Sequence, residues 1–294
     1  MTGLTITVGS LYPDLMSTYG DRGNVAAITR RCAWRDIAVQ VISLGLGDKV
    51  APGDVDLFMI GGGGESQQRL VAPDLYKVKG PRIRDAVQAG AAALAVGGGF
   101  ELFGRFCQPE EGTEFRGIEL FDCWTIRNAS VLGDHYGTIS EARADRFIGE
   151  LVVRWGGMLL VGFENHSGGT YLGPAAQPLG QVASGHGNNG DGSEGVIAGS
   201  AIGTNLRGPC LPRNPELADY LIRGALAHRY GEVDLEPLAD HLEHAARDAA
   251  VRRARSADRG HGVGHVLRHR GRRPVPDTPA PSRHGISLRA GMRR

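Results

Sequence analysis

The chain is poor in cysteine, poor in lysine and without a long apolar run, and each scarcity excludes a class of protein. Four cysteines in 294 residues are scattered, with no Cys-x-x-Cys pair and no cysteine–histidine spacing of a metal site. We expect free thiols in a reducing compartment, and neither a metal nor another cofactor. No stretch reaches the roughly 18 unbroken apolar residues of a membrane span. The N-terminus lacks the basic and apolar segments of a signal peptide, so a cytoplasmic protein is expected.

Charge is distributed unevenly along the chain. The 33 basic residues include only three lysines, and residues 251–294 hold twelve arginines against two aspartates, so the rest of the chain is mildly acidic. From Arg259 onward, Arg, Gly, His and Pro dominate; this composition cannot form a core and predicts a disordered tail. Such a tail binds nucleic acid, binds an anionic surface or has no role. We divide the chain into a folded domain over 1–232, a charged helical extension over 233–257 and a basic tail over 258–294.

The first hundred residues alternate short apolar strands with helical patterns. This alternation predicts a doubly wound, flavodoxin-like α/β fold with a mostly parallel sheet, and the functional groups of such folds lie at the carboxyl edge of the sheet. The expected strands are Leu4–Val8, Val39–Leu44, Val55–Ile60 and Ala91–Val96. The expected helices are Val25–Arg35, Ile83–Gln88 and Gly98 to about Phe106.

The second half of the chain is less regular. Asn-Gly and Asp-Gly pairs between Gly185 and Gly195 suggest a hairpin. Asn214-Pro215-Glu216 predicts the start of a helix that ends near Tyr230, because Asn caps a helix and Pro suits its first turn. A further charged helix is expected over Leu235–Ala257. Strands are expected over Arg143–Leu151, Leu159–Phe163 and Val196–Ile202.

Two glycine-rich turns that follow buried strands are candidates for a site. In Ala92–Gly104 a short apolar strand enters Gly97-Gly98-Gly99 and then a helix. A residue at such a turn is held beside backbone N–H groups, which is the geometry of a nucleophile elbow and of phosphate sites. The four glycines Gly61–Gly64 let further N–H groups approach a ligand closely.

These turns, with Tyr12–Asn24 and Glu164–Gly173, resemble the class I, or triad-type, glutamine amidotransferases. The similarity covers roughly residues 4–230 and is greatest to the cobyric-acid-synthase-like branch, within it to the glutaminase subunits of lipid II isoglutaminyl synthases. In that family the elbow carries a cysteine followed by Gly-Gly, an aromatic residue and Gln, where this chain has Gly97-Gly98-Gly99-Phe100-Glu101. A later Tyr-Leu-His-Gly carries the catalytic base, where this chain has Asn205-Leu206-Arg207-Gly208.

The resemblance therefore implies a glutaminase site that has lost its two reacting groups. Gly97 stands at the position of the nucleophilic cysteine, and Arg207 stands at the position of the histidine. The backbone donors of the oxyanion hole are implied to come from the glycine loop and from the residue after the nucleophile. These residues are Gly62, Gly63 and Gly98.

Two further polar residues are candidates. The resemblance implies that Arg146 holds the substrate, and the planar fork of an arginine suits a carboxylate; the alternative is a solvated surface arginine. His166 has the side chain of a general base. A histidine that orients its own loop through hydrogen bonds is the interpretation that we favour for it.

Glutamine hydrolysis by the family mechanism is predicted to be absent. Gly97 has no side chain to attack the amide, and Arg207 stays protonated at neutral pH. Cys107, expected about 15 Å further along the helix at 1.5 Å per residue, and Cys210, beyond a Gly-Pro turn, cannot replace the thiol. Loss of both groups points to relaxed or repurposed selection, and the fixed charge of Arg207 favours an anion.

Three functions stay open at this point. The family role is to release ammonia from glutamine for a Mur-ligase-like, ATP-dependent partner that amidates the D-glutamate of lipid II in peptidoglycan biosynthesis; it requires a nucleophile that the sequence does not reveal. The second is a non-catalytic subunit of the same complex, whose partner draws free ammonia. The third is an amidotransferase scaffold whose basic tail binds nucleic acid or an anionic surface.

Overall fold

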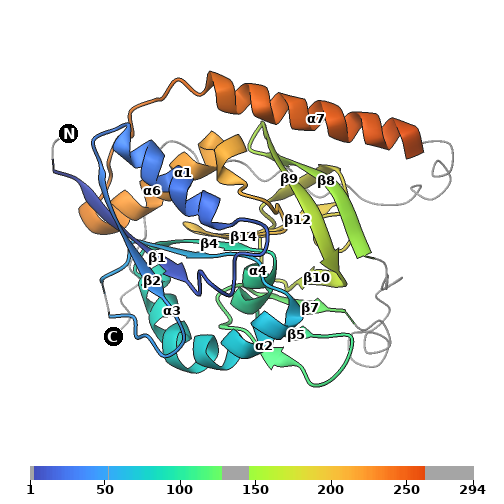
Figure 1. Ribbon diagram of the computed structural model, residues 1–294, viewed down its shortest axis with the longest axis horizontal. Helices are drawn as coiled ribbons and strands as arrows, with labels where there is room; N and C mark the ends of the chain where they lie inside the picture. The colour runs from blue at the N-terminus through green and yellow to red at the C-terminus, as the bar shows by residue number, and fades with distance from the viewer. Residues whose placement is uncertain (1–2, 52, 128–145, 262–294) are drawn as a thin grey trace.

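A six-stranded sheet forms the centre of the molecule, in a computed structural model that describes residues 3–51, 53–127 and 146–261 (Figure 1). The strand order is β13-β14-β4-β3-β1-β2, and every neighbouring pair is parallel except β13-β14. The expected α/β fold with a mostly parallel sheet is confirmed. The strands are β1 (Thr5–Leu11), β2 (Ala38–Leu44), β3 (Leu57–Ile60), β4 (Ala92–Val96), β13 (Val196–Ala198) and β14 (Ala201–Thr204).

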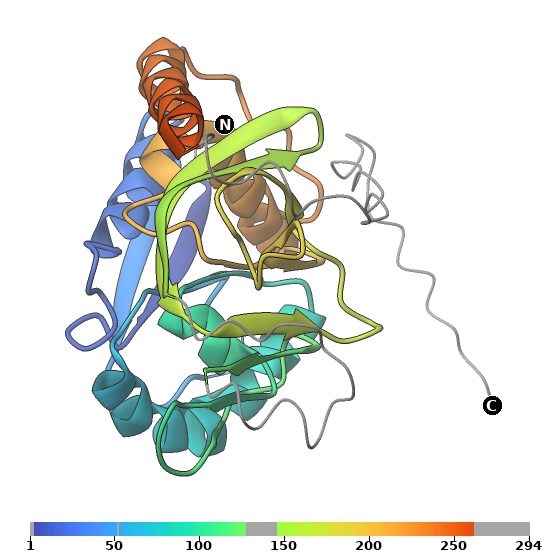
Figure 2. The same cartoon turned by 90° about the vertical axis from the view of Figure 1, so that its right-hand side faces the viewer.

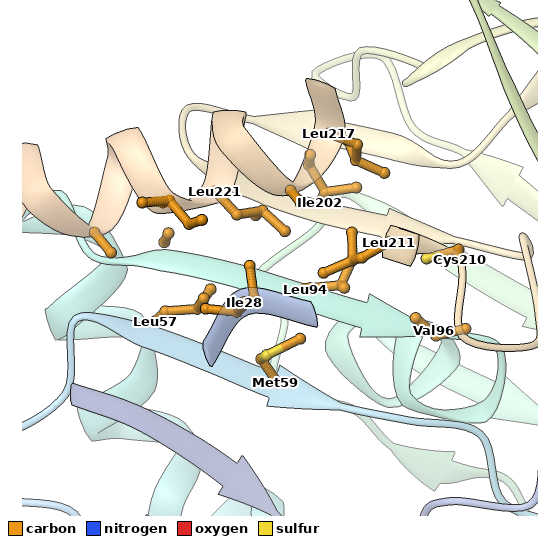
Figure 3. Close-up of a cluster of buried hydrophobic side chains, with 14 of the residues drawn as sticks. Ile28, Leu57, Met59, Leu94, Val96, Ile202, Cys210, Leu211, Leu217 and Leu221 are labelled. Atoms are coloured by element: carbon orange, nitrogen blue, oxygen red, sulfur yellow. The ribbon is translucent and has the colours of Figure 1, made fainter. Parts of the chain in front are cut away.

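Helices cover both faces of this sheet (Figure 1). Two pack on one face through the first hydrophobic core, where Ile28 and Leu221 meet Leu57 and Leu94 of the sheet (Figure 3). Three pack on the other face through a second core. The first two are α1 (Arg22–Ala33) and α6 (Pro215–Tyr230), and the other three are α2 (Glu65–Asp74), α3 (Gly80–Gln88) and α4 (Gly98–Phe103).

The central strands β3 and β4 are buried along their whole length. Because each lies between two helical layers, both sets of side chains face apolar surroundings, and a continuous apolar run results. The edge strand β2 is exposed or half-buried at six of its seven residues. The apolar runs of β3 and β4 and the alternating pattern of β2 each locate their strand to within two residues of the predicted bounds.

Two four-stranded sheets accompany the central one. Their strand orders are β10-β7-β5-β6 and β12-β11-β8-β9. In the second, β8 and β9 form a long antiparallel hairpin that stands beside the central sheet (Figure 2). The strands are β5 (Phe106–Gln108), β6 (Phe115–Arg116), β7 (Cys123–Ile126), β8 (Arg146–Trp155), β9 (Met158–Ser167), β10 (Gly169–Leu172), β11 (Gly180–Ser184) and β12 (Ser193–Glu194).

The last helix, α7 (His241–His261), packs against the β8–β9 hairpin. Arg253 Nε also donates to Glu150 Oε1 of the hairpin at 3.0 Å. None of the helices described here is long and apolar enough to span a bilayer, and α7 is strongly charged. The apolar contact joins Ala250, Val251 and Ala254 to Val152, Val161 and Leu159.

Two expected elements have different bounds from those predicted. A single strand over Val196–Ile202 was wrong, because the chain turns at Gly199, with φ +55°, and returns as the antiparallel pair β13 and β14. The helix after the elbow ends at Phe103 because Gly104 is extended, with φ −74° and ψ −165°. Cys107 therefore lies in β5 and not on that helix.

Sequence reasoning missed α2 and misplaced the start of α7. Pro73 lies inside α2, and the chain continues through the π-helical turn Leu75–Lys79, a pattern that does not read as a regular helix. The helix expected over Leu235–Ala257 begins at His241. Residues 143–145 of the predicted strand and the basic tail from residue 262 lie outside the described residues.

Candidate functional site

Gly97 forms a sharp elbow between β4 and α4. Its backbone has φ +54° and ψ −115°, a conformation that residues with a Cβ adopt only at an energetic cost. The elbow is fixed on both sides, since Gly97 N–H donates to the Thr204 carbonyl at 2.8 Å and the Gly97 carbonyl accepts from Glu101 N–H at 3.0 Å. The predicted strand–turn–helix at this position is present, with strain at its turning residue.

The glycine loop after β3 lies directly against this elbow. A Cβ on Gly98 would lie 2.8 Å from the Gly63 carbonyl oxygen, and a Cβ on Gly99 would lie 2.7 Å from that of Gly61. The close approach of the two backbones therefore requires glycine on the elbow. Gly62 N–H donates to Asp21 Oδ2 at 2.9 Å. The structure brings Gly62, Gly63, Gly97 and Gly98 together, and their role as oxyanion donors stays a prediction.

The guanidinium of Arg207 occupies the space beside Gly97. A Cβ on Gly97 would lie 2.6 Å from Arg207 Cζ and 2.7 and 2.9 Å from its two terminal nitrogens, and a Cβ on Gly62 would lie 3.1 Å from Nη1. Backbone hydrogen bonds hold Arg207 opposite Phe163, with Arg207 N–H donating to the Phe163 carbonyl at 2.8 Å. The two positions that have lost the family's reacting groups, Gly97 and Arg207, thus lie side by side, and the Arg207 guanidinium fills the space beside Gly97.

Arg207 is a buried cation, and none of the residues that the structure describes forms a hydrogen-bonded counter-ion to it. Only 6% of the residue is exposed, and among the described residues its buried Nε has no hydrogen-bond partner. Burial lowers the pKa of the guanidinium, and this effect outweighs the opposing influence of Glu101, Tyr19 and Asp21. The Tyr19 ring lies 5.5 Å from Arg207 Cζ and supplies a cation–π contact. Even with a lowered pKa, an arginine stays charged at neutral pH.

A second buried arginine, Arg127, neutralises Glu101 next to the elbow. Arg127 Nη2 donates to Glu101 Oε2 and, at 3.0 Å, to Gln68 Oε1, while Nη1 donates to Glu65 Oε2 at 3.2 Å. Burial opposes its charge, but the carboxylates of Glu101 and Glu65 raise the pKa of Arg127 above its usual value. From the sequence, Glu101 stands at the position of a family Gln and was assigned no role. No motif in the sequence identifies Arg127 as part of the site.

Arg146 is exposed at the first position of β8 and touches the elbow only through other side chains. Its Nε donates to Asn165 Oδ1 at 2.8 Å, and Asn165 Nδ2 donates to the Tyr19 hydroxyl at 2.9 Å. Because Tyr19 lies on the Arg207 guanidinium, these contacts connect Arg146 to the elbow. Its substrate-binding role remains a prediction.

His166 is buried in β9, in edge-to-face contact with Phe147 at a centroid distance of 5.2 Å. Burial and the nearby charge of Arg207 lower the pKa of His166 to about 3. An imidazole with such a pKa is neutral at physiological pH and is a weak base. The side chain therefore does not replace the missing catalytic histidine.

The cysteines do not offer a substitute nucleophile. All four are buried. Cys107 Sγ lies 3.6 Å from Glu101 Oε2, closer to the elbow region than sequence reasoning placed it, but burial raises its pKa well above the usual range. Burial also raises the pKa of Cys210 to about 12. Both remain thiols at neutral pH, and the thiolate is the nucleophilic form.

A parallel sheet with a strained elbow and an abutting glycine loop at the ends of neighbouring strands defines the class I glutamine amidotransferase fold. A family model of the CobB/CobQ-like glutamine amidotransferase domain matches residues 7–215. The chain belongs to this family.

Two curated relatives have the same description, lipid II isoglutaminyl synthase (glutamine-hydrolyzing) subunit GatD. The protein from Staphylococcus aureus (strain N315) is 30% identical over 251 residues, which cover 85% of this chain and 96% of the relative. The protein from Streptococcus pneumoniae (strain ATCC BAA-255 / R6) is 31% identical over 230 residues, 77% of this chain and 83% of the relative. The solved structure of PurLQS from Thermotoga maritima covers 76% of this chain and 98% of its own, with 15% identity and a TM-score of 0.48.

Proposed function

We propose that the chain is the amidotransferase-fold subunit of a lipid II isoglutaminyl synthase and that it does not itself hydrolyse glutamine. The observation that carries the second part is the contact between Gly97 and Arg207, where a guanidinium lies 2.6 to 2.9 Å from the place of a nucleophile's Cβ. The first part is supported by the similarity to two subunits of that name, over 85% and 77% of this chain.

The chemistry of amide cleavage explains why hydrolysis fails. The reaction needs a nucleophile to form the acyl intermediate and a base to accept its proton. Gly97 supplies no nucleophile and Arg207 no base, while the pKa values of His166 and Cys107 keep the former neutral and the latter protonated. Loss of such a pair together costs several orders of magnitude, on the order of 10⁶-fold in a well-studied protease.

The proposed partner is a Mur-ligase-like, ATP-dependent subunit in the cytoplasm that amidates the D-glutamate of lipid II. In the family, glutamine is the ammonia source. In this complex the ligase uses free ammonia, and the present chain serves as a binding subunit. Retention of the fold, of both hydrophobic cores and of the glycine loop supports a role that depends on the folded surface.

The test is an ammonia-release assay on the purified chain, alone and with a candidate Mur-ligase-like partner protein. We expect no release from glutamine above the rate of a Gly98→Glu control, whose side chain has no room against the Gly63 carbonyl. We also expect the two proteins to co-purify, and amidation to require ammonium. Release from glutamine at the rate of a working amidotransferase would contradict the loss of hydrolysis, and failure to co-purify would contradict the subunit role.

A further inference from the structure

The Arg207 guanidinium is a buried charged group for which the part of the chain that the structure describes offers no ion pair or side-chain hydrogen bond. It is 6% exposed, and its Nε is buried without a hydrogen-bond partner. A buried charge normally has a paired counter-ion and hydrogen bonds, because its transfer from water is otherwise costly. A buried donor without a partner calls for an explanation, and an ion or water that binds from solution is one such explanation.

The nearby carboxylates form hydrogen bonds to other groups, and in the part of the chain that the structure describes the second oxygen of Asp21, Oδ1, is buried without a partner. Asp21 Oδ2 accepts the Gly62 N–H at 2.9 Å. Glu101 Oε2 accepts from Gln68 Nε2 at 3.1 Å and from Arg127. Asp21 and Glu101 therefore influence Arg207 through space without hydrogen-bonding to it, and Arg127 adds a second positive charge to the same region.

The other polar group coupled to Arg207 is also a poor counter-charge. His166 Nε2 is buried without a partner among the described residues, and Arg207 is the leading charge that acts on this ring. A neutral imidazole supplies no negative charge. Among the residues that the structure describes, the Tyr19 ring lies over Arg207, but no acceptor forms a hydrogen bond with its side-chain N–H groups.

We propose that Arg207 binds a small oxyanion at the Gly97 elbow, either the carboxylate of a free amino acid such as L-glutamate or an inorganic oxyanion such as phosphate. A guanidinium donates two parallel hydrogen bonds to either group. This assignment rests on the proposed function in one respect, namely that the site no longer turns over glutamine. The proposed site therefore binds an anion at the position where the family binds the neutral amide of glutamine.

Binding is measured on the full chain by thermal shift and by titration calorimetry at constant ionic strength, with sodium L-glutamate, acetate and phosphate as separate probes. We expect at least one oxyanion to bind, with an affinity at least about tenfold weaker in Arg207→Gln, the effect of losing about 1.4 kcal/mol. The matched control is Arg82→Gln, which removes an exposed arginine of α3. This control binds like the unaltered chain.

A stronger response to L-glutamate than to acetate and phosphate identifies an amino-acid carboxylate as the source, and equal responses identify a simple oxyanion. If Arg207→Gln does not fold, binding is followed by NMR through the Arg207 Nε–H resonance of ¹⁵N-arginine-labelled protein. This resonance is assigned with Arg207→Lys, and its shift on addition of an oxyanion reports binding at Arg207. Equal binding by Arg207→Gln, or no response of the unaltered chain to any probe, would overturn the proposal. The assay is independent of ammonia release and of the partner, so its failure is distinguishable from failure of the proposed function.

Discussion

The space beside Gly97 is shared between the backbone of one residue and the side chain of another. Adding a methyl group in Gly97→Ala forces the Arg207 guanidinium, 2.6 Å away, to move out of its buried position. With the positive φ of Gly97, we expect a loss of about 2–6 kcal/mol in the free energy of unfolding, combining about 1–3 kcal/mol of overpacking with about 1–3 kcal/mol of backbone strain. In an Arg207→Ala background the same change should cost only the strain, about 1–3 kcal/mol.

Urea unfolding of the two single variants and the double variant completes this cycle. A coupling energy of at least about 1 kcal/mol is expected for residues in direct contact. Additive losses would show that the guanidinium moves aside freely and does not fill the elbow. Arg82→Ala, with the same change of residue type at an exposed position, is the control and should not couple to Gly97→Ala.

Glu194 gives the native state a measurable dependence on pH. Burial raises its pKa to about 7, although the Thr204 hydroxyl and the Asn205 N–H both donate to Oε1 at 2.7 Å. A folded pKa above the unfolded 4.5 means that the contribution to stability is complete below pH 4.5 and is lost as pH rises through 7. Glu194→Gln stays neutral and escapes this loss, so relative to the unaltered chain it should gain on the order of 3 kcal/mol between pH 4.5 and 8.

Urea unfolding at pH 4.5 and pH 8 checks this difference, and a difference that does not change with pH would refute the raised pKa. The comparison with the variant is needed because His166 acts in the opposite direction. Its pKa falls to about 3 in the folded state, so its contribution is present above pH 6.5 and is lost as pH falls toward 3. The two residues partly cancel between pH 4.5 and 6.5 in the unaltered chain.

At the scale of helices and strands, an element could be predicted where its own residues form a clear apolar pattern, and not where distant contacts decide its place. The strands β3 and β4 are wholly buried, so their apolar runs identify them from sequence. The helix α2 was missed because Pro73 interrupts its pattern, and its place is decided by packing of residues such as Val71 in the second core. Parts of β8 and β9 were predicted as two separate strands, but their pairing over ten residues each depends on contacts that a single sequence does not reveal.

The helix α7 contributes to stability through one narrow apolar stripe. Ala254 is 1% exposed against the β8–β9 hairpin. Replacing it by Glu buries an unpaired carboxylate, which should lower the free energy of unfolding by about 2–4 kcal/mol. The control is Arg252→Glu on the exposed side of the same helix, where a change within about 0.5 kcal/mol is expected. Equal effects of the two changes in urea unfolding would show that the helix does not pack on the hairpin.

At the scale of the whole molecule, the candidate site combines segments that are far apart in sequence. Resemblance to a family located Gly97, Arg207 and the glycine loop, and the structure brings all of them together. It did not reveal that Arg207 fills the space at Gly97, that Arg127 pairs with Glu101, or that Cys107 lies beside Glu101. These contacts arise from folding β4, β7 and β14 around one elbow, and a one-dimensional pattern does not contain them.

Because the rest of the amidotransferase fold is intact, restoring the two reacting groups should restore hydrolysis. Gly97→Cys alone should stay inactive, since the guanidinium occupies the place of the new side chain and no base is present. Arg207→His alone lacks the nucleophile. The double variant should release ammonia from glutamine at least about 10³-fold faster than either single variant, because the two groups act as a unit. An inactive double variant that folds with an unchanged midpoint would show that further parts of the catalytic site, such as Arg146 and its contacts, are also lost.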